Sequence, residues 1–176
     1  MIPTSVVNAI HAVLRAHGTK DRPHWSHFAK IESDPGSDLF VVEATDAVMA
    51  LTIAFSNPEF VDWGGVAWVS ERNLRNPKTV QVNLNAEAPA DYPESVRNHL
   101  ERRMASATAN VDIHLSTYYW MVINRVLSEL AVTGRAMELT CAGRLGPLCV
   151  TLRGGETDKW VEANIFVMGL VREDSA

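Results

Sequence analysis

The sequence predicts an α+β fold in which two units, each a helix followed by antiparallel strands, form one domain over residues 1–176. Two observations predict it. Apolar residues recur at helical spacing near residues 4–17 and again over residues 116–131. After each of these segments come short runs of alternating or continuous apolar residues, separated by turn-forming clusters, which is typical of antiparallel strands. A length of 176 residues and a hydrophobic fraction of 47% suit one domain with a buried core.

The first unit begins with a helix that Pro3 opens and Gly18 ends. Its apolar stripe is formed by Val6, Val7, Ile10, Val13, Leu14 and His17, and its other face carries Asn8, His11 and Arg15. Strands are expected over residues 24–33, 39–45 and 47–55. The sequence SDPGSD between the first two has the composition of a turn.

The middle segment, residues 57–109, is atypical and harder to assign. Strands are expected over residues 66–70 and 79–85, with a short helical turn between them. Asp91 is placed to cap a further helix that contains a basic cluster, formed by Arg97, Arg102 and Arg103. Two interpretations of this cluster remain open: a DNA or partner contact, and a surface helix whose arginines pair with Glu94 and Glu101. The second is favoured.

The second unit repeats the order of the first without repeating its sequence. A strand is expected over residues 110–115, and Ser116 is a good N-cap for the helix that follows. The stripe of that helix is formed by Tyr119, Val122, Ile123, Val126, Leu127 and Leu130. Strands then follow over residues 136–142, 146–152 and 160–171, with the sequence RGGETD as a hairpin turn.

His24 and His27, three residues apart, raise the question of a metal site. On the expected strand, residues three apart point to opposite faces, so these two should not chelate one ion. Cys141 and Cys149 are too few for a disulfide framework or a zinc cage, and free thiols in a reducing cytoplasm are expected. Neither a signal peptide nor a membrane-spanning run is expected.

An enzyme is a rival class, but its motifs are missing from the sequence. There is no G-x-S-x-G, no phosphate-binding glycine-rich loop and no H-E-x-x-H. The candidate reactive groups are the two cysteines, the six histidines and Asp46. A turn aspartate is the favoured interpretation of Asp46. The sequence therefore predicts no catalytic residue, metal or cofactor.

Two stretches of the chain resemble a domain of the bacterial DNA polymerase III beta subunit, the sliding clamp. The first is RPHWSHFAKIES followed by DLFVVEATDAVMALTIAF, and the second is the helix STYYWMVINRVLSEL with the last strand NIFVMGLVRE. The residues that carry the likeness in the first stretch are Arg22, Pro23, Trp25, Phe28, Thr45 and Asp46. The chain departs from the family at Ala47, where the family often has Gly, and at Gly169, where it usually has Pro. The likeness covers residues 3–56 and 110–172.

The resemblance implies a ring of six such domains whose helices surround duplex DNA. A clamp protomer has three domains and this chain has room for one, so a homo-hexamer is implied. The helices at residues 4–17 and 116–131 would line the hole. Phosphate contacts by lysine and arginine are independent of base sequence. The DNA-binding residues implied are Arg15, Lys20, Arg22 and Arg125, with Glu129 opposing them.

Clamps also hold short peptides from a DNA polymerase or other partners in an apolar pocket. By resemblance, Phe166, Met168 and Leu170 on the last strand contribute to it, although these residues suit a buried core equally well. Trp120 and Met121 are candidates for a subunit contact. The net charge of −5 favours an alternative, a clamp-shaped protein-binding adaptor that does not encircle DNA. An uncharacterised small enzyme is the second alternative.

Overall fold

The protein is described by a computed structural model over residues 2–16, 23–46, 48–58, 63–74, 88–93, 115–130, 137–141, 147–155 and 158–168. Several predicted features lie outside these residues. They are the strand at 79–85, the helix after Asp91 with its arginines, most of the strand at 110–115, and the side chains of His17, Lys20, Arg22 and Leu170.

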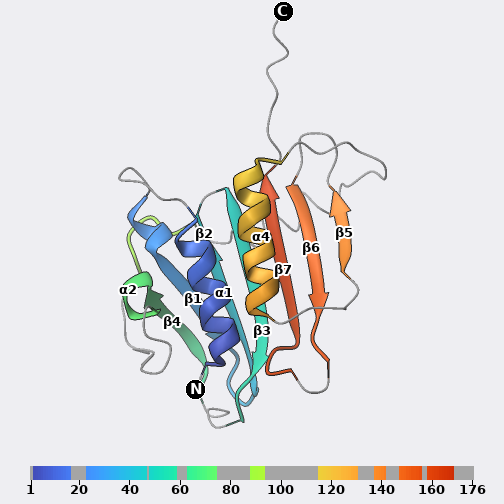
Figure 1. Cartoon of the computed structure of the whole chain (residues 1–176). Coiled ribbons are helices and arrows are strands. Elements are labelled where there is room, and N and C mark those ends of the chain that lie inside the picture. Colours follow the sequence, from blue (N-terminus) through green and yellow to red (C-terminus); the bar gives the residue numbers. More distant parts are fainter. Residues whose placement is uncertain are drawn as a thin grey trace, which may run out of the picture.

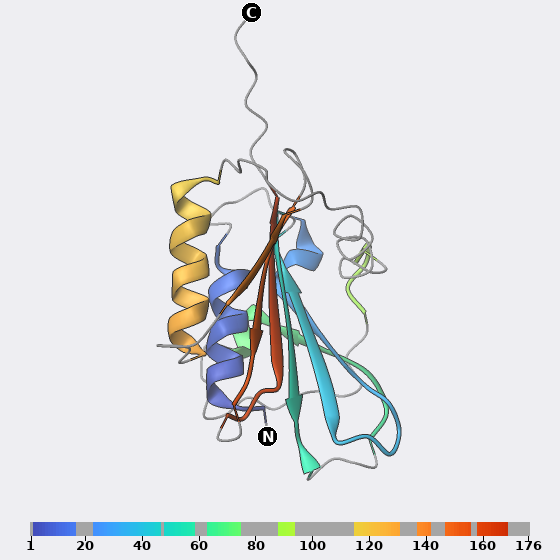
Figure 2. The same cartoon turned by 90° about the vertical axis from the view of Figure 1, so that its right-hand side faces the viewer.

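Within the described residues, the architecture is one antiparallel sheet of seven strands with two helices packed on one of its faces (Figures 1 and 2). The helices are α1 (Thr4–Leu14) and α4 (Thr117–Glu129), and a short α2 (Glu71–Leu74) flanks α1. The strands are β1 (Phe28–Ser33), β2 (Leu39–Thr45), β3 (Met49–Ser56), β4 (Gly65–Ser70), β5 (Glu138–Cys141), β6 (Pro147–Arg153) and β7 (Glu162–Met168). Their order across the sheet is β4-β1-β2-β3-β7-β6-β5. The predicted α+β class is therefore confirmed.

The two predicted units meet in the middle of the sheet. The first is α1 with β1, β2 and β3, and the second is α4 with β5, β6 and β7. Strand β3 pairs with β7 in antiparallel register from Met49 opposite Val167 to Ala54 opposite Glu162. This pairing makes the sheet continuous, so both helices cover a single core.

The core lies between the helices and the sheet, as the predicted stripes require. Side chains alternate along each strand, and β3 directs Met49, Leu51, Ile53 and Phe55 to the helix side. The predicted stripes of both helices are confirmed where they are described, because Val7, Ile10, Ile123 and Val126 are buried there, among others. Ser116 caps α4 by accepting from the Tyr118 amide, as predicted.

The prediction of a strand over residues 24–33 is wrong for its first four residues. His24–His27 form a 3₁₀ helix, η1, and β1 begins only at Phe28. The backbone amide and the hydroxyl of Ser26 both donate to the Pro23 carbonyl, at 3.0 and 2.7 Å, which closes a tight turn. The apparent alternation of side chains in this segment is therefore misleading, because its first four residues form a turn that precedes the strand.

We call the face of the sheet opposite the helices the outer face. A small aromatic cluster covers part of it. Residues 88–93 cross that face, on the side away from the helices (Figure 2). The Tyr92 ring lies edge-on to Trp25 and Trp68, with centroids 5.9 and 4.5 Å away. Its hydroxyl donates to the carboxylate of buried Glu43 at 3.4 Å. Burial, and then the Glu43 charge, raise the pKa of Tyr92 far above its usual value.

This raised pKa predicts that alkaline pH weakens the fold through Tyr92. A group whose pKa is higher in the folded state contributes stability below its unfolded-state pKa, about 10 for tyrosine, and loses it as pH rises further. We expect the free energy of unfolding to fall less steeply above about pH 10 in Tyr92→Phe than in the native chain. Urea unfolding at neutral and alkaline pH measures this. Equal slopes for the two chains would contradict the assignment.

Candidate nucleic-acid interface

The two long helices form the surface on which the sequence placed DNA contacts. They lie side by side and antiparallel (Figure 1). The Tyr118 hydroxyl at the start of α4 donates to the Ala16 carbonyl beyond the end of α1. At the opposite ends, the Asn8 amide donates to the Glu129 carboxylate at 3.0 Å. These two contacts link the helices into one face.

The predicted DNA-binding residues are brought onto this face in part. Arg15 follows the last residue of α1 and is exposed, and Arg125 is exposed on α4. Arg15 is not a free cation, because its Nε lies 3.9 Å from a carboxylate oxygen of Glu71 on α2. Lys20 and Arg22 lie outside the described residues, so their placement stays a prediction.

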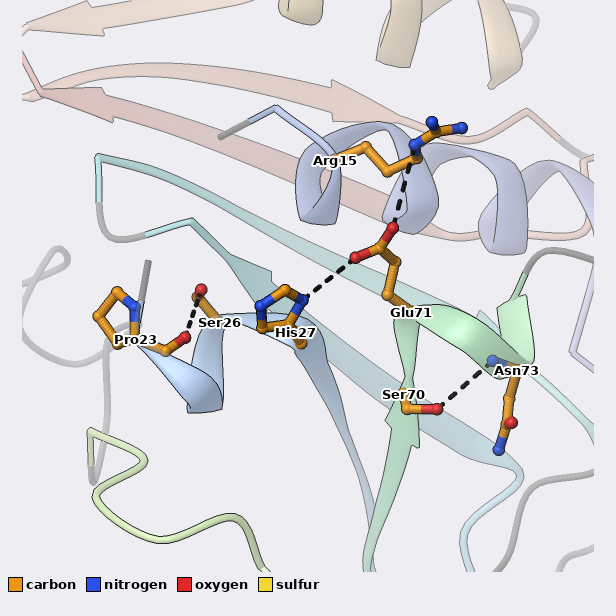
Figure 3. Close-up of polar contacts among 7 residues, drawn as sticks. All are labelled: Arg15, Pro23, Ser26, His27, Ser70, Glu71 and Asn73. Carbon is orange, nitrogen blue, oxygen red and sulfur yellow. Dashed lines mark hydrogen bonds and ion pairs between the residues drawn. The ribbon is translucent and has the colours of Figure 1, made fainter. Parts of the chain in front are cut away.

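The histidine pair is explained by its contacts. His27 Nδ1 lies 3.2 Å from the other oxygen of Glu71 (Figure 3), and the His24 ring packs against Phe28 with centroids 5.2 Å apart. The strand argument against chelation does not apply in the 3₁₀ helix, where residues three apart share a face. Among the described residues, no three His, Cys, Asp or Glu side chains gather as metal ligands would.

The exposed face of α4 is more apolar than expected for a surface that slides on DNA. Tyr118, Trp120 and Met121 are exposed there by 41, 49 and 61%. Together with Arg125 they give the helix an amphiphilic outer surface. The sequence singled out Trp120 and Met121 as candidates for a subunit contact, and their exposure is compatible with that role.

The predicted peptide-pocket residues lie on the outer face. Phe166 and Met168 project there from β7, and Phe166 packs with Ala50 and Cys149 in a small buried cluster. Phe166 is only 4% exposed, whereas Met168 is half-buried at the rim of the cluster. Leu170 lies outside the described residues. Phe166 is therefore buried, as the core interpretation of these residues implies, but it lies in this outer cluster, because the register of β7 gives the helix side to Ala163, Ile165 and Val167.

Asp46 has a structural role in the turn between β2 and β3. It is fully buried, and its Oδ1 accepts from the amides of Val48 and Met49 at 3.0 and 2.6 Å. Its Oδ2 accepts from the Tyr119 hydroxyl of α4 at 3.3 Å. Burial, and then the Asp46 charge, raise the pKa of Tyr119. Asp46 thus ties α4 to the sheet, and the prediction of a turn aspartate is confirmed.

The two cysteines, which are further candidate reactive groups, lie in β5 and β6. Cys149 is buried, and burial raises the pKa of the half-buried Cys141, which disfavours the nucleophilic thiolate. A hollow of about 310 Å³ lies at the start of α1, lined by Pro3, Thr4 and Lys159 among others. It is at the opposite end of α1 from Arg15 and contains none of the predicted site residues.

No protein-family model and no curated protein matches this sequence. Solved structures do resemble the fold. The beta subunit of DNA polymerase from Streptococcus pyogenes has a TM-score of 0.58 at 10% identity, covering 95% of this chain and 64% of that chain. The Bacillus subtilis sliding clamp also has a TM-score of 0.58, at 9% identity over 97% of this chain and 63% of that chain. A Helicobacter pylori beta clamp bound to a DNA ligase peptide has a TM-score of 0.52 at 7% identity, covering 94% and 63%.

These comparisons define the class of the protein as an α+β clamp fold. More particularly, the fold resembles that of DNA polymerase III beta subunits, as the sequence resemblance implied. The chain spans slightly less than two thirds of the length of the clamp chains it matches. At about 10% identity the likeness concerns the fold alone.

Sequence reasoning missed Glu71, the residue that joins Arg15 and His27. The signal for its helix was available, since Ser70 precedes it and accepts from the Asn73 amide at 3.4 Å. The position of that helix beside α1 could not be predicted from the sequence, because it depends on the pairing of β4 with β1.

Within the described ranges, no helix has the length and apolar character needed to cross a membrane.

Proposed function

We propose that this chain is a non-catalytic, sliding-clamp-like factor of DNA replication or repair. Copies of it close into a homo-oligomeric ring around duplex DNA, with α1 and α4 facing the DNA. One observation carries the proposal. Two long helices lie side by side on one face of a continuous antiparallel sheet, and the fold resembles solved sliding clamps over most of the chain.

The DNA contacts in this proposal are arginine and lysine contacts to phosphates. Arg15 and Arg125 are exposed on the helix face, and Lys20 and Arg22 follow α1 in the sequence. Such contacts depend on salt and carry no base specificity, as sliding requires. One chain offers few such cations, but in a ring the rotational symmetry repeats them in every subunit.

Ring closure would use the two outer strands of the sheet. Among the described residues, no strand pairs with the outer edge of β4 or of β5. Such edges offer unpaired backbone donors and acceptors, and β4 of one copy meeting β5 of the next is a head-to-tail contact that closes when the rotation fits. With one clamp-like domain in each chain, six copies would complete a six-domain ring.

A partner peptide would bind on the outer face near Met168. Binding of a partner peptide has a parallel in the Helicobacter pylori beta clamp, which was solved with a DNA ligase peptide bound. Of the two described members of the predicted set, Met168 is the more accessible, and its flexible side chain suits variable apolar ligands. Phe166 would form the floor beneath it, and Leu170 would extend the surface. The expected partner is a DNA polymerase or another protein carrying such a peptide.

Two measurements test the ring. Light scattering on a sizing column at moderate salt should give a mass of about six times the 19.4 kDa chain. The protein should then stay on nicked circular DNA and slide off the same DNA once it is cut to a linear form. A monomer or dimer that leaves both forms equally fast would remove the topological mechanism.

An adaptor that never encloses DNA is the second candidate function. It is favoured by the charge of the helix face, where Asn8 engages Glu129 and Glu71 pairs with Arg15. Monomeric protein that binds a partner peptide and leaves DNA free would establish this function instead.

A further inference from the structure

In the part of the helix face that the structure describes, the charges are nearly balanced. Within their bounds, α1 has no Lys, Arg, Asp or Glu, and α4 has only Arg125 and Glu129. Arg15 follows α1 directly, and Glu71 brings a second carboxylate to this face from α2. Among the described residues of α1, α4 and their immediate contacts, two arginines therefore face two carboxylates, a composition that holds DNA weakly.

Glu71 is held in place more firmly than the arginine it pairs with. One carboxylate oxygen lies 3.9 Å from Arg15 Nε and the other 3.2 Å from His27 Nδ1 (Figure 3). The Glu71 side chain is 12% exposed, whereas that of Arg15 is 59% exposed. Because α2 starts directly after β4, the sheet fixes the position of Glu71. The carboxylate is thus a fixed feature of the fold, and the guanidinium remains at the surface.

We propose that Glu71 weakens the contact of Arg15 with DNA by competing with phosphate for the same guanidinium. This inference rests on the proposed function. A phosphate must share Arg15 with Glu71 or displace it, so part of the electrostatic attraction is lost at each copy of the chain. A weakened contact suits a ring that is retained by topology, because tight phosphate binding would slow its movement along the duplex.

Glu71→Gln tests the proposal as a gain of binding. The amide keeps an oxygen acceptor for His27 and removes the negative charge beside Arg15. We expect the affinity for a fluorescently labelled linear duplex, read by anisotropy at low salt, to rise roughly two- to five-fold. The plot of log affinity against log salt should steepen by up to about 0.9 for each subunit in contact.

The matched control is Glu32→Gln, which makes the same chemical change on the outer face, in β1. Glu32 is exposed and pairs with Lys30, which lies opposite Glu43 and so shares the outer face with it. Binding should be unchanged by this control. In the Arg15→Gln background, Glu71→Gln should give no gain, because the residue through which it acts is gone.

Each result decides the proposal. Tighter binding by Glu71→Gln that disappears in the Arg15→Gln background supports it. If Glu71→Gln binds no tighter while Arg15→Gln weakens binding, the inference is overturned and the lining stands. If Arg15→Gln binds DNA as the native chain does, Arg15 makes no contact with DNA. That result contradicts both the proposed DNA contacts and the inference that rests on them. Glu71→Ser, which removes the carboxylate and keeps a hydroxyl acceptor, repeats the test if the melting temperature shows that Gln disturbs the fold.

Discussion

Replacing Arg15 and Arg125 together with Glu is expected to abolish retention on circular DNA while leaving the fold intact. Both side chains are exposed, so their loss removes no core packing. Each substitution converts a phosphate contact into a repulsion, and in a ring the change is repeated in every subunit. Because each lost contact removes one released counterion, we expect affinity for duplex DNA to fall by about a thousand-fold or more.

The experiment compares native and variant proteins on nicked circular DNA across a salt series. Melting temperatures confirm that the variants are folded. The control is Arg153→Glu, which makes the same substitution on the outer face of β6. Because it is a single substitution, its retention on DNA is compared with that of the single variant Arg15→Glu. Unchanged retention in the double variant would refute the proposed lining, whatever the mass of the assembly.

Asp46→Ala is expected to destabilise the protein by about 3 kcal/mol, because three donors lose their acceptor inside the fold. The amides of Val48 and Met49 and the Tyr119 hydroxyl all donate to this carboxylate. Alanine offers them nothing, and Asp46 is fully buried, so water cannot readily take its place. The loss also releases α4 from the turn between β2 and β3.

Urea unfolding of a pair of conservative variants separates these contributions. Asp46→Asn keeps one oxygen acceptor and should lose less stability than Asp46→Ala. Tyr119→Phe removes only the hydrogen bond from α4 to Asp46 and should lower the free energy of unfolding by about 1 kcal/mol. A loss below 1 kcal/mol in Asp46→Ala would show that the turn does not depend on this side chain.

The part of the fold that could be predicted is the part fixed by neighbouring residues. Strand β2 was predicted with its observed bounds, and α4 was predicted together with its cap Ser116. These elements depend on apolar period and on side-chain contacts to the adjacent backbone, both of which the sequence displays. The prediction failed at His24–His27, where a 3₁₀ turn closed by Ser26 produces the same apolar spacing as the start of a strand.

The candidate site could be predicted only in outline. The sequence identified Arg15 and Arg125 as cations on the helices, because their positions follow from helical periodicity. It placed Phe166 and Met168 on one face of a strand, but which face depends on the register of β7 against β3.

The sequence by itself determined the α+β class, the two helix-and-strand units and the surface on which cations would lie. Only the tertiary structure decided that β3 joins β7, that residues 88–93 cross the outer face, and that Glu71 lies beside Arg15. The physical reason is the range of the interactions. Periodicity and capping act over a few residues, whereas strand pairing and ion pairing join segments far apart in the chain, and many such pairings satisfy the same local pattern.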